Sequence, residues 1–195
     1  MLRERSERAK VRKALYVIVL ISPLSCLFST MYTGGDQLHY HHVYELISDK
    51  GLIASYLIYR NNLGSSELGH FMLTWLVSGW LEKDLLFTGL NTLLLMYAVL
   101  FLNKVTHRSP ILILSLLISN YYMFVLMFSA ERLKVAFMFM LAFMYYYKRV
   151  SLRIPLLTMA ITSHLSIVLL IVSSFTPRVI KAFQRLISKG RLSIT

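Results

Sequence analysis

Four polar side chains border or interrupt the apolar stretches of this 195-residue sequence: Asp36, Glu67, Arg132 and His164. Carboxylates accept protons and hydrogen bonds, arginine binds anions through a planar fork, and histidine exchanges a proton near neutral pH. Such groups cost free energy inside a membrane unless they are paired or face a cavity. They are therefore the candidate functional residues.

Each of these residues also has a structural interpretation. Asp36 suits a helix cap, and Glu67 suits a solvated charge at the start of an apolar stretch. Arg132 suits an arginine whose long stem reaches the membrane surface, and His164 suits a neutral imidazole bonded to a neighbouring helix. The residue types alone leave both interpretations open.

Three histidines, His39, His41 and His42, follow Asp36 closely enough to raise the question of a metal site. On a helix, residues 36, 39 and 42 share a broad face, whereas His41 points elsewhere. Zinc sites usually draw tightly spaced ligands from two elements, and no cysteine or second histidine pair is near. The sequence also lacks a phosphate-binding glycine loop and a nucleophile elbow. We expect no metal and no cofactor.

The composition is that of a membrane protein. Hydrophobic residues make up 56% of the chain and charged residues only 15%, against roughly 25% charged in soluble domains. The net charge of +12 does not indicate nucleic-acid binding, because the basic residues concentrate at the two ends. Basic ends around apolar stretches predict a multi-pass membrane protein with a cytoplasmic N-terminus.

Six apolar stretches of 19, 14, 18, 19, 15 and 22 residues can be drawn: 14–32, 68–81, 85–102, 110–128, 133–147 and 154–175. A membrane-spanning helix needs about 20 residues, so the second and fifth stretches are short. We expect the second to be re-entrant or spanning, and the fifth to be extended by snorkelling of Lys134 and Lys148. The prediction is an all-α helical bundle with five or six spans over residues 14–175. It lies between a basic cytoplasmic segment, 1–13, and a basic tail, 176–195.

Residues 33–67 form the longest segment between stretches and are expected outside the membrane. After Gly34-Gly35-Asp36, the residues Leu38, Val43, Leu46 and Ile47 recur at helical spacing. This pattern predicts an amphipathic helix in the membrane interface.

Counting Lys and Arg does not decide between the two topologies. Six crossings put 14 basic residues inside and 7 outside, whereas five put 11 inside and 10 outside. Without the five basic residues of the tail, the counts become 9 against 7 for six crossings and 11 against 5 for five. The preferred topology therefore depends on the tail.

A series of short motifs accompanies these stretches. In chain order they are Gly35-Asp36-x-x-x-Tyr40, Glu67-x-Gly69-His70, the break Glu82-Lys83-Asp84, Tyr121-Tyr122-x-Phe124, Arg132-x-x-x-Ala136 and Thr162-Ser163-His164-Leu165-Ser166. With these motifs the chain resembles the EpsG-like family of exopolysaccharide and O-antigen polymerases, the Wzy-type membrane glycosyltransferases.

The resemblance implies a GT-C-like enzyme of the bacterial inner membrane that joins lipid-linked oligosaccharide repeats at the outer face. Its substrate would be a glycan on undecaprenyl pyrophosphate. Membrane lipids and chain-length regulator or flippase proteins would be its other partners, with no nucleic acid. The implied catalytic residues are Asp36, Arg132 and His164, and the implied substrate-binding residues are Tyr40, Glu67, His70, Tyr121 and Tyr122.

Two departures from the family pattern predict a short or truncated member. Family members commonly carry an arginine several residues before the Gly-x-Asp motif, whereas this stretch reads Ser29-Thr30-Met31-Tyr32, and a basic tail stands where family members usually continue through further spans. Two other functional classes also fit the sequence. A transporter or flippase component would use intramembrane polar residues such as His164, Asn91 and Asn120. A non-catalytic assembly subunit for polysaccharide export would need none of them.

Overall fold

The computed structural model describes residues 2–32, 34, 36–173 and 184, and every regular element within these ranges is a helix. The predicted all-α fold is therefore confirmed. The helices are α1 (Leu2–Met31), α2 (Asp36–Ile47), α3 (Leu52–Leu63), α4 (Leu68–Ser78), α5 (Lys83–Thr106), α6 (Pro110–Ile118), α7 (Tyr121–Phe128), α8 (Glu131–Tyr145) and α9 (Val150–Ser163). A further helical stretch covers 166–173.

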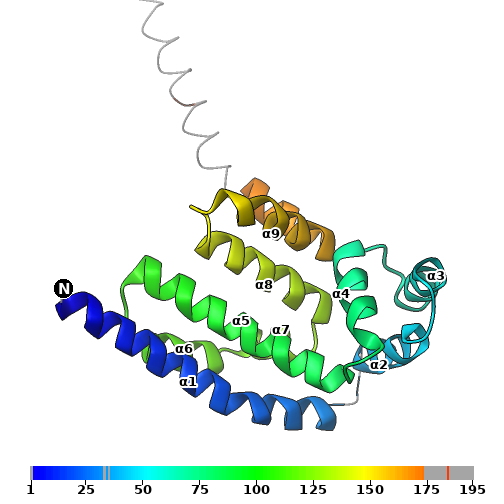
Figure 1. Cartoon of the computed structure of the whole chain (residues 1–195), viewed down its shortest axis with the longest axis horizontal. Helices are drawn as coiled ribbons and strands as arrows, with labels where there is room; N and C mark the ends of the chain where they lie inside the picture. Colours follow the sequence, from blue (N-terminus) through cyan, green and yellow to red (C-terminus); the bar gives the residue numbers. More distant parts are fainter. Residues whose placement is uncertain (1, 33, 35, 174–183, 185–195) are drawn as a thin grey trace, which may run out of the picture.

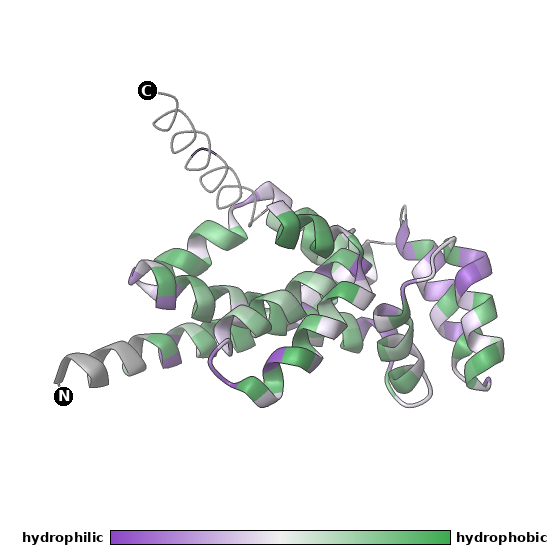
Figure 2. Ribbon diagram, turned by 90° about the horizontal axis from the view of Figure 1, so that it is seen from above, coloured by the Kyte–Doolittle hydropathy of each residue, from purple (hydrophilic) through white to green (hydrophobic). Residues whose placement is uncertain are grey.

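Helix α5 occupies the centre of the bundle, with α1 along one side and α8, followed by α9, along the other (Figure 1). Its buried residues Leu94 and Val99 share one apolar core with Ile18 of α1 and Val135 of α8. Helices α2, α3 and α4 gather at the end of the bundle where α1 ends and α5 begins (Figure 1). Polar residues are prominent at this end, whereas the long helices are mainly apolar (Figure 2).

Among the residues that the structure describes, two helices are long and apolar enough to cross a membrane, Val11–Met31 and Lys83–Thr106. Helices α6 and α7 make a third candidate if they are taken together as one bent span. Large apolar side chains such as Leu20 and Met31 lie exposed on α1, as expected for a helix that faces lipid. These features identify a membrane-associated protein.

Two predicted apolar stretches are broken in the structure. The stretch 110–128 bends by 74° between α6 and α7, where the Asn120 side chain accepts a hydrogen bond of 3.1 Å from the Met123 amide. The stretch 154–175 breaks at His164, whose backbone is extended after α9 ends at Ser163. Apolar residues continue on both sides of each break, so hydropathy does not reveal it.

Helix α2 confirms the predicted helix after Asp36, but its buried face differs from the prediction. Tyr40, Val43, Tyr44 and Ile47 are buried, whereas Leu38 is 59% exposed. The buried face of α2 therefore combines the predicted positions Val43 and Ile47 with two tyrosines, Tyr40 and Tyr44.

Gly69 allows α4 and α9 to approach closely. A Cβ atom at this position would lie 2.6 Å from the side-chain oxygens of Thr162 and Ser163 and 2.8 Å from the Ser163 amide nitrogen. The motif that contains Glu67 and the motif that contains His164 therefore pack directly against each other. Only glycine fits at this contact without a shift of the backbone.

Candidate functional site

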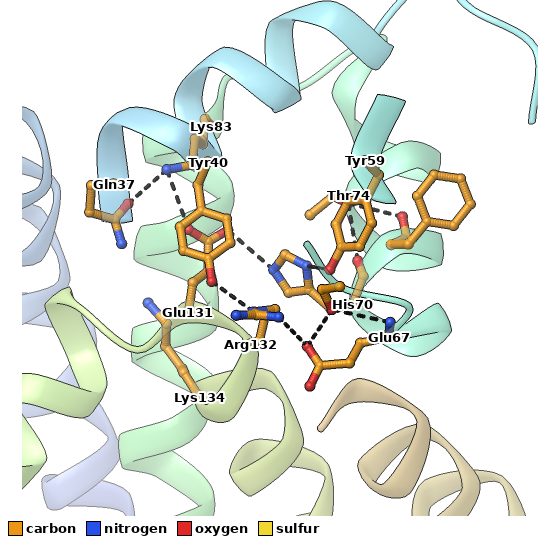
Figure 3. A network of polar contacts seen from close by, with 12 residues as sticks. Gln37, Tyr40, Tyr59, Glu67, His70, Thr74, Lys83, Glu131, Arg132 and Lys134 are labelled. Atoms are coloured by element: carbon orange, nitrogen blue, oxygen red, sulfur yellow. Dashed lines mark hydrogen bonds and ion pairs between the residues drawn. The ribbon is translucent and has the colours of Figure 1, made fainter. Parts of the chain in front are cut away.

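Four side chains meet at the end of the bundle where α2 lies: Tyr40, Glu67, Arg132 and His164, here called the half-buried group. Arg132 Nε donates to the Tyr40 hydroxyl over 2.8 Å, and its Nη1 donates to Glu67 Oε2 over 2.9 Å (Figure 3). His164 Nδ1 lies 3.4 Å from the other Glu67 oxygen. The group joins α2, the start of α4, the first turn of α8 and the end of α9.

Local structure holds the Glu67 carboxylate in place. Glu67 is the residue before the first turn of α4, and its backbone is extended. The Ser65 hydroxyl donates to Glu67 Oε2 over 3.0 Å, and the Glu67 amide donates back to the Ser65 oxygen over 3.3 Å. These contacts aim the carboxylate at Arg132.

The half-buried group retains hydrogen-bond donors for a ligand. His164 Nδ1 is occupied by the Ser166 amide at 3.3 Å and by Glu67 Oε1 at 3.4 Å, so Nε2 is the ring nitrogen that remains for a ligand. In the part of the chain that the structure describes, neither this nitrogen nor Arg132 Nη2 has a hydrogen-bond partner. The Arg132 and His164 side chains are each 28% exposed. The arrangement therefore suits recognition of an anionic or hydroxyl-rich ligand.

A second set of side chains lies deeper, and we call Gln37, Tyr59, His70, Lys83 and Glu131 the buried group. Tyr59 Oη and His70 Nδ1 are 2.9 Å apart, and His70 Nε2 lies 3.4 Å from Glu131 Oε1. Lys83 Nζ lies 3.3 Å from Glu131 Oε2 and donates to Gln37 Oε1 over 2.7 Å (Figure 3). All five residues are almost inaccessible to solvent.

The buried group supports the half-buried group through α8. Glu131 and Arg132 are neighbours in the first turn of this helix, so the contacts of Glu131 fix the position from which Arg132 extends. His70 lies in the first turn of α4, three residues after Glu67. Glu131 and His70 thus connect the buried group to the helix turns that carry Arg132 and Glu67, which pre-organises the site.

Lys134 corrects one expectation from the sequence. It does not snorkel to a membrane surface but is fully buried. Its Nζ donates to Asn91 Oδ1 over 2.9 Å and to the Met127 carbonyl over 2.8 Å, and Asn91 donates in turn to Ser25. The reason is that α8 packs against α5 with this face inward, so the lysine finds protein acceptors before it reaches water.

Burial keeps the two tyrosines of the site protonated. Burial raises the pKa of Tyr40 to about 12, although the neighbouring Arg132 acts in the opposite direction. Burial also raises the pKa of Tyr59 well above its usual value. Both phenols are therefore neutral at physiological pH, and Tyr59 can donate to His70.

The structure separates the remaining predicted residues from this site. Asp36 is exposed at the start of α2, one turn before Tyr40, and makes no hydrogen bond or ion pair among the described residues. Tyr121 and Tyr122 are 75% and 80% exposed and contact each other edge to face where α6 meets α7. His70 is 1% exposed, so it is a positioning residue in this structure and not a direct substrate contact.

Sequence reasoning missed Tyr59, Lys83, Glu131 and Lys134 as parts of the site. Glu131 and Lys134 are spaced i, i+3 at the start of an apolar stretch, which puts them on neighbouring positions of a helix. An acidic and a basic residue at this spacing, followed by apolar residues, was an available signal. Lys83 lies in the Glu82-Lys83-Asp84 motif, but nothing in that motif or around Tyr59 indicated a buried partner for either side chain.

The three histidines of α2 do not converge. His39 and His42 are exposed, and His41 Nε2 lies 3.6 Å from Asp84 Oδ1. Among the residues that the structure describes, no group of three or more His, Cys, Asp or Glu side chains could hold a metal ion.

The candidate site is therefore an arginine held by a tyrosine and a carboxylate, with a histidine beside it and a buried ionic network behind it. No protein-family model, curated protein or solved structure matches this chain.

Proposed function

We propose that this chain is a membrane glycosyltransferase of the EpsG-like polysaccharide-polymerase type in the bacterial inner membrane. The observation that carries the proposal is the position of Arg132. Its guanidinium is held by Tyr40 and Glu67 while Nη2 remains without a partner in the described chain. A fixed arginine with a spare donor suits a pyrophosphate leaving group.

The proposed reaction transfers a glycan from undecaprenyl pyrophosphate to a hydroxyl group of another lipid-linked repeat. The acceptor oxygen forms a bond to the anomeric carbon as the bond from that carbon to the pyrophosphate oxygen breaks. The pyrophosphate leaves with the electron pair, and the acceptor proton passes to a base. Negative charge grows on the leaving group, so a positioned cation lowers the barrier.

The candidate residues divide these tasks. Arg132 and the Nε2 proton of His164 stabilise the leaving pyrophosphate, while Glu67 and Tyr40 hold Arg132 and orient sugar hydroxyls. Asp36 is the proposed base, because it is an exposed carboxylate one turn from Tyr40 on α2 and is free to approach an acceptor hydroxyl. Tyr121 and Tyr122 remain candidates for stacking against sugar rings, at a place separate from this site.

We propose that the bundle crosses the membrane five times and has a GT-C-like organisation. The arrangement of the helices supports five crossings. Phe28 near the end of α1 stacks on Phe128 at the end of α7, and Arg132 at the start of α8 contacts Tyr40. The beginning of α8 therefore lies at the same end of the bundle as α2. Helix α4 has only 11 residues and lies across this end (Figure 1), so it suits a re-entrant segment.

A transporter or flippase component is the second candidate, and the buried group favours it. A buried carboxylate, Glu131, with a histidine and a lysine each within 3.4 Å of it resembles a proton relay of a membrane protein. The length profile of the surface glycan in a deletion strain separates the two functions. Loss of long chains with single repeats retained indicates a polymerase, whereas loss of all lipid-linked glycan outside indicates a flippase.

Purified protein in vesicles tests the polymerase directly, with a polyprenyl-pyrophosphate-linked repeat as substrate. We expect Arg132→Ala to lower the rate by about 10²- to 10³-fold, and Asp36→Asn and His164→Gln to lower it as well. Arg60→Ala and Asp49→Asn change exposed residues of the same outer segment and should leave the rate unchanged. Wild-type rates in Asp36→Asn and Arg132→Ala would refute the catalytic assignment, whereas no polymerisation by the wild-type protein would favour a non-catalytic assembly subunit.

A further inference from the structure

A second, basic cavity lies at the opposite end of the bundle from the candidate site. It has a volume of about 700 Å³ and is open to the surface. Four cationic side chains line it: Arg12, Lys104, Lys148 and Arg149. They come from the start of α1, the end of α5 and the connection from α8 to α9, three segments that lie at the same end in Figure 1. Segments distant in sequence thus bring four positive charges together.

Within the described part of the chain, no acidic side chain neutralises the cations of this cavity. None of its lining residues is acidic. Among the described residues, Arg12, Lys148 and Arg149 form no ion pair with a carboxylate, and all three are exposed. Like charges that gather without counter-charges are unfavourable unless an anion from outside balances them.

The cavity also has an apolar wall and two aromatic side chains. Val11, Leu15 and Leu100 line it from α1 and α5. Lys104 donates to the Tyr145 carbonyl over 2.7 Å and lies over the Tyr145 ring, which holds this ammonium group in place. A site with cations beside an apolar wall suits an amphiphilic anion better than a free inorganic one.

We propose that this cavity binds the phosphate head group of an anionic phospholipid, with the first segments of the acyl chains against the apolar wall. Arg12 and Arg149 offer planar forks for the phosphate oxygens, and Lys104 and Lys148 act as point charges. The cavity lies at the end of the bundle that carries the basic N-terminal segment, where the positive-inside pattern places the cytoplasmic leaflet. Basic pockets between membrane helices on that side are suited to anionic head groups. The proposal does not depend on the chemistry at the other end.

Native mass spectrometry of the purified full chain in detergent tests this proposal, with phosphatidylglycerol as the probe and phosphatidylcholine as the neutral comparison. We expect retention of phosphatidylglycerol and little retention of phosphatidylcholine. Removal of one cation should weaken binding about fivefold, so the triple change Arg12→Gln, Lys148→Gln and Arg149→Gln should weaken it roughly 100-fold. Binding should also fall as ionic strength rises.

Arg108→Gln and Arg153→Gln serve as the matched controls, because both residues are exposed arginines outside the cavity. They should leave phosphatidylglycerol binding unchanged, and the thermal stability of every variant without lipid should match that of the wild type. Undiminished binding by the triple variant, or an equal loss in the controls, would overturn the proposal. Inorganic phosphate that binds as tightly as the lipid would also overturn it, because the apolar wall would then contribute nothing.

Discussion

Arg132 and Glu67 lie 65 residues apart in the sequence and form an ion pair of 2.9 Å between α8 and the residue that precedes α4. The same guanidinium reaches Tyr40 on α2. One side chain therefore ties together three segments at the end of the bundle, and this connection makes the local motifs of the sequence into one site.

The strength of this ion pair can be measured with a double-mutant cycle of Arg132→Gln and Glu67→Gln. The side chains are 28% and 13% exposed, so we expect a coupling energy of about 1 kcal/mol and not the several kcal/mol of a fully buried pair. Unfolding in mixed detergent micelles provides the free energies. A cycle of Glu67→Gln with Arg60→Gln, an exposed arginine of α3, should show no coupling. Equal coupling in both cycles would contradict the pairing.

Gly69→Ala tests the close contact between α4 and α9. The new Cβ would lie 2.8 Å from the Ser163 backbone nitrogen, which cannot rotate away as a side chain can. We expect a loss of about 1–3 kcal/mol in the free energy of unfolding. Gly89→Ala in α5 is the control, because no atom lies within 4 Å of its added Cβ, and it should be neutral or stabilising by about 0.5–1 kcal/mol. An equally stable Gly69→Ala protein would show that the two helices can separate freely.

Glu131→Gln tests the buried group. It leaves Lys83 and His70 without the carboxylate that lies 3.3 and 3.4 Å away, so we expect a loss of about 3 kcal/mol in the free energy of unfolding. Glu45→Gln, at an exposed position of α2, should change stability by less than about 0.5 kcal/mol. Adding Lys83→Met to Glu131→Gln should restore part of the loss. If the double variant recovered no stability, the loss in Glu131→Gln would not come from an unpaired Lys83.

The raised pKa of Tyr40 predicts that the folded protein loses stability at alkaline pH. Burial raises the pKa of this phenol to about 12 in the folded protein, against about 10 in the unfolded chain. The neutral phenol therefore contributes stability that is fully present below about pH 10 and is lost as the pH rises toward 12. Free energies of unfolding between pH 9 and 11.5 should fall more steeply for the wild type than for Tyr40→Phe. The exposed Tyr121→Phe is the control, and identical slopes for all three proteins would rule out this contribution.

Reporter fusions test the five-crossing topology. Fusions after Asn103 and after Lys148 should both report the cytoplasmic side, because α5 and α8 run in the same direction away from the candidate site. A fusion after Lys50, between α2 and α3, should report the outside. An outside signal at both Asn103 and Lys148 would refute five crossings.

Much of the candidate site follows from one physical rule that applies to the sequence. Polar groups in a very apolar chain must find partners, so Glu67, Arg132 and His164 could be selected before their contacts were known. Tyr40 was selected because it shares a motif with Asp36, and in the structure its hydroxyl accepts a hydrogen bond from Arg132. Asp36 shares the helix and lies one turn from Tyr40, but it makes no hydrogen bond or ion pair among the described residues, because it is exposed at the start of α2.

The burial of charged residues behind the site could not be predicted in the same way. Lys134 fits both a snorkelling residue and a buried one, since its sequence neighbours are apolar in either case. Only the packing of α8 on α5 brings it to Asn91. The same holds for Lys83, which looks like a loop residue until Glu131 and Gln37 are placed around it.

The sequence by itself determined the helical class of this protein, its membrane character and the identity of its isolated polar residues, because composition and periodicity are local properties of the chain. The tertiary structure alone decided where the apolar stretches break, as at His164, and which face of α2 is buried. It also decided that Arg132 meets Glu67 and Tyr40. These outcomes depend on the partner that each side chain finds, and a partner distant in the sequence leaves no mark on local hydropathy.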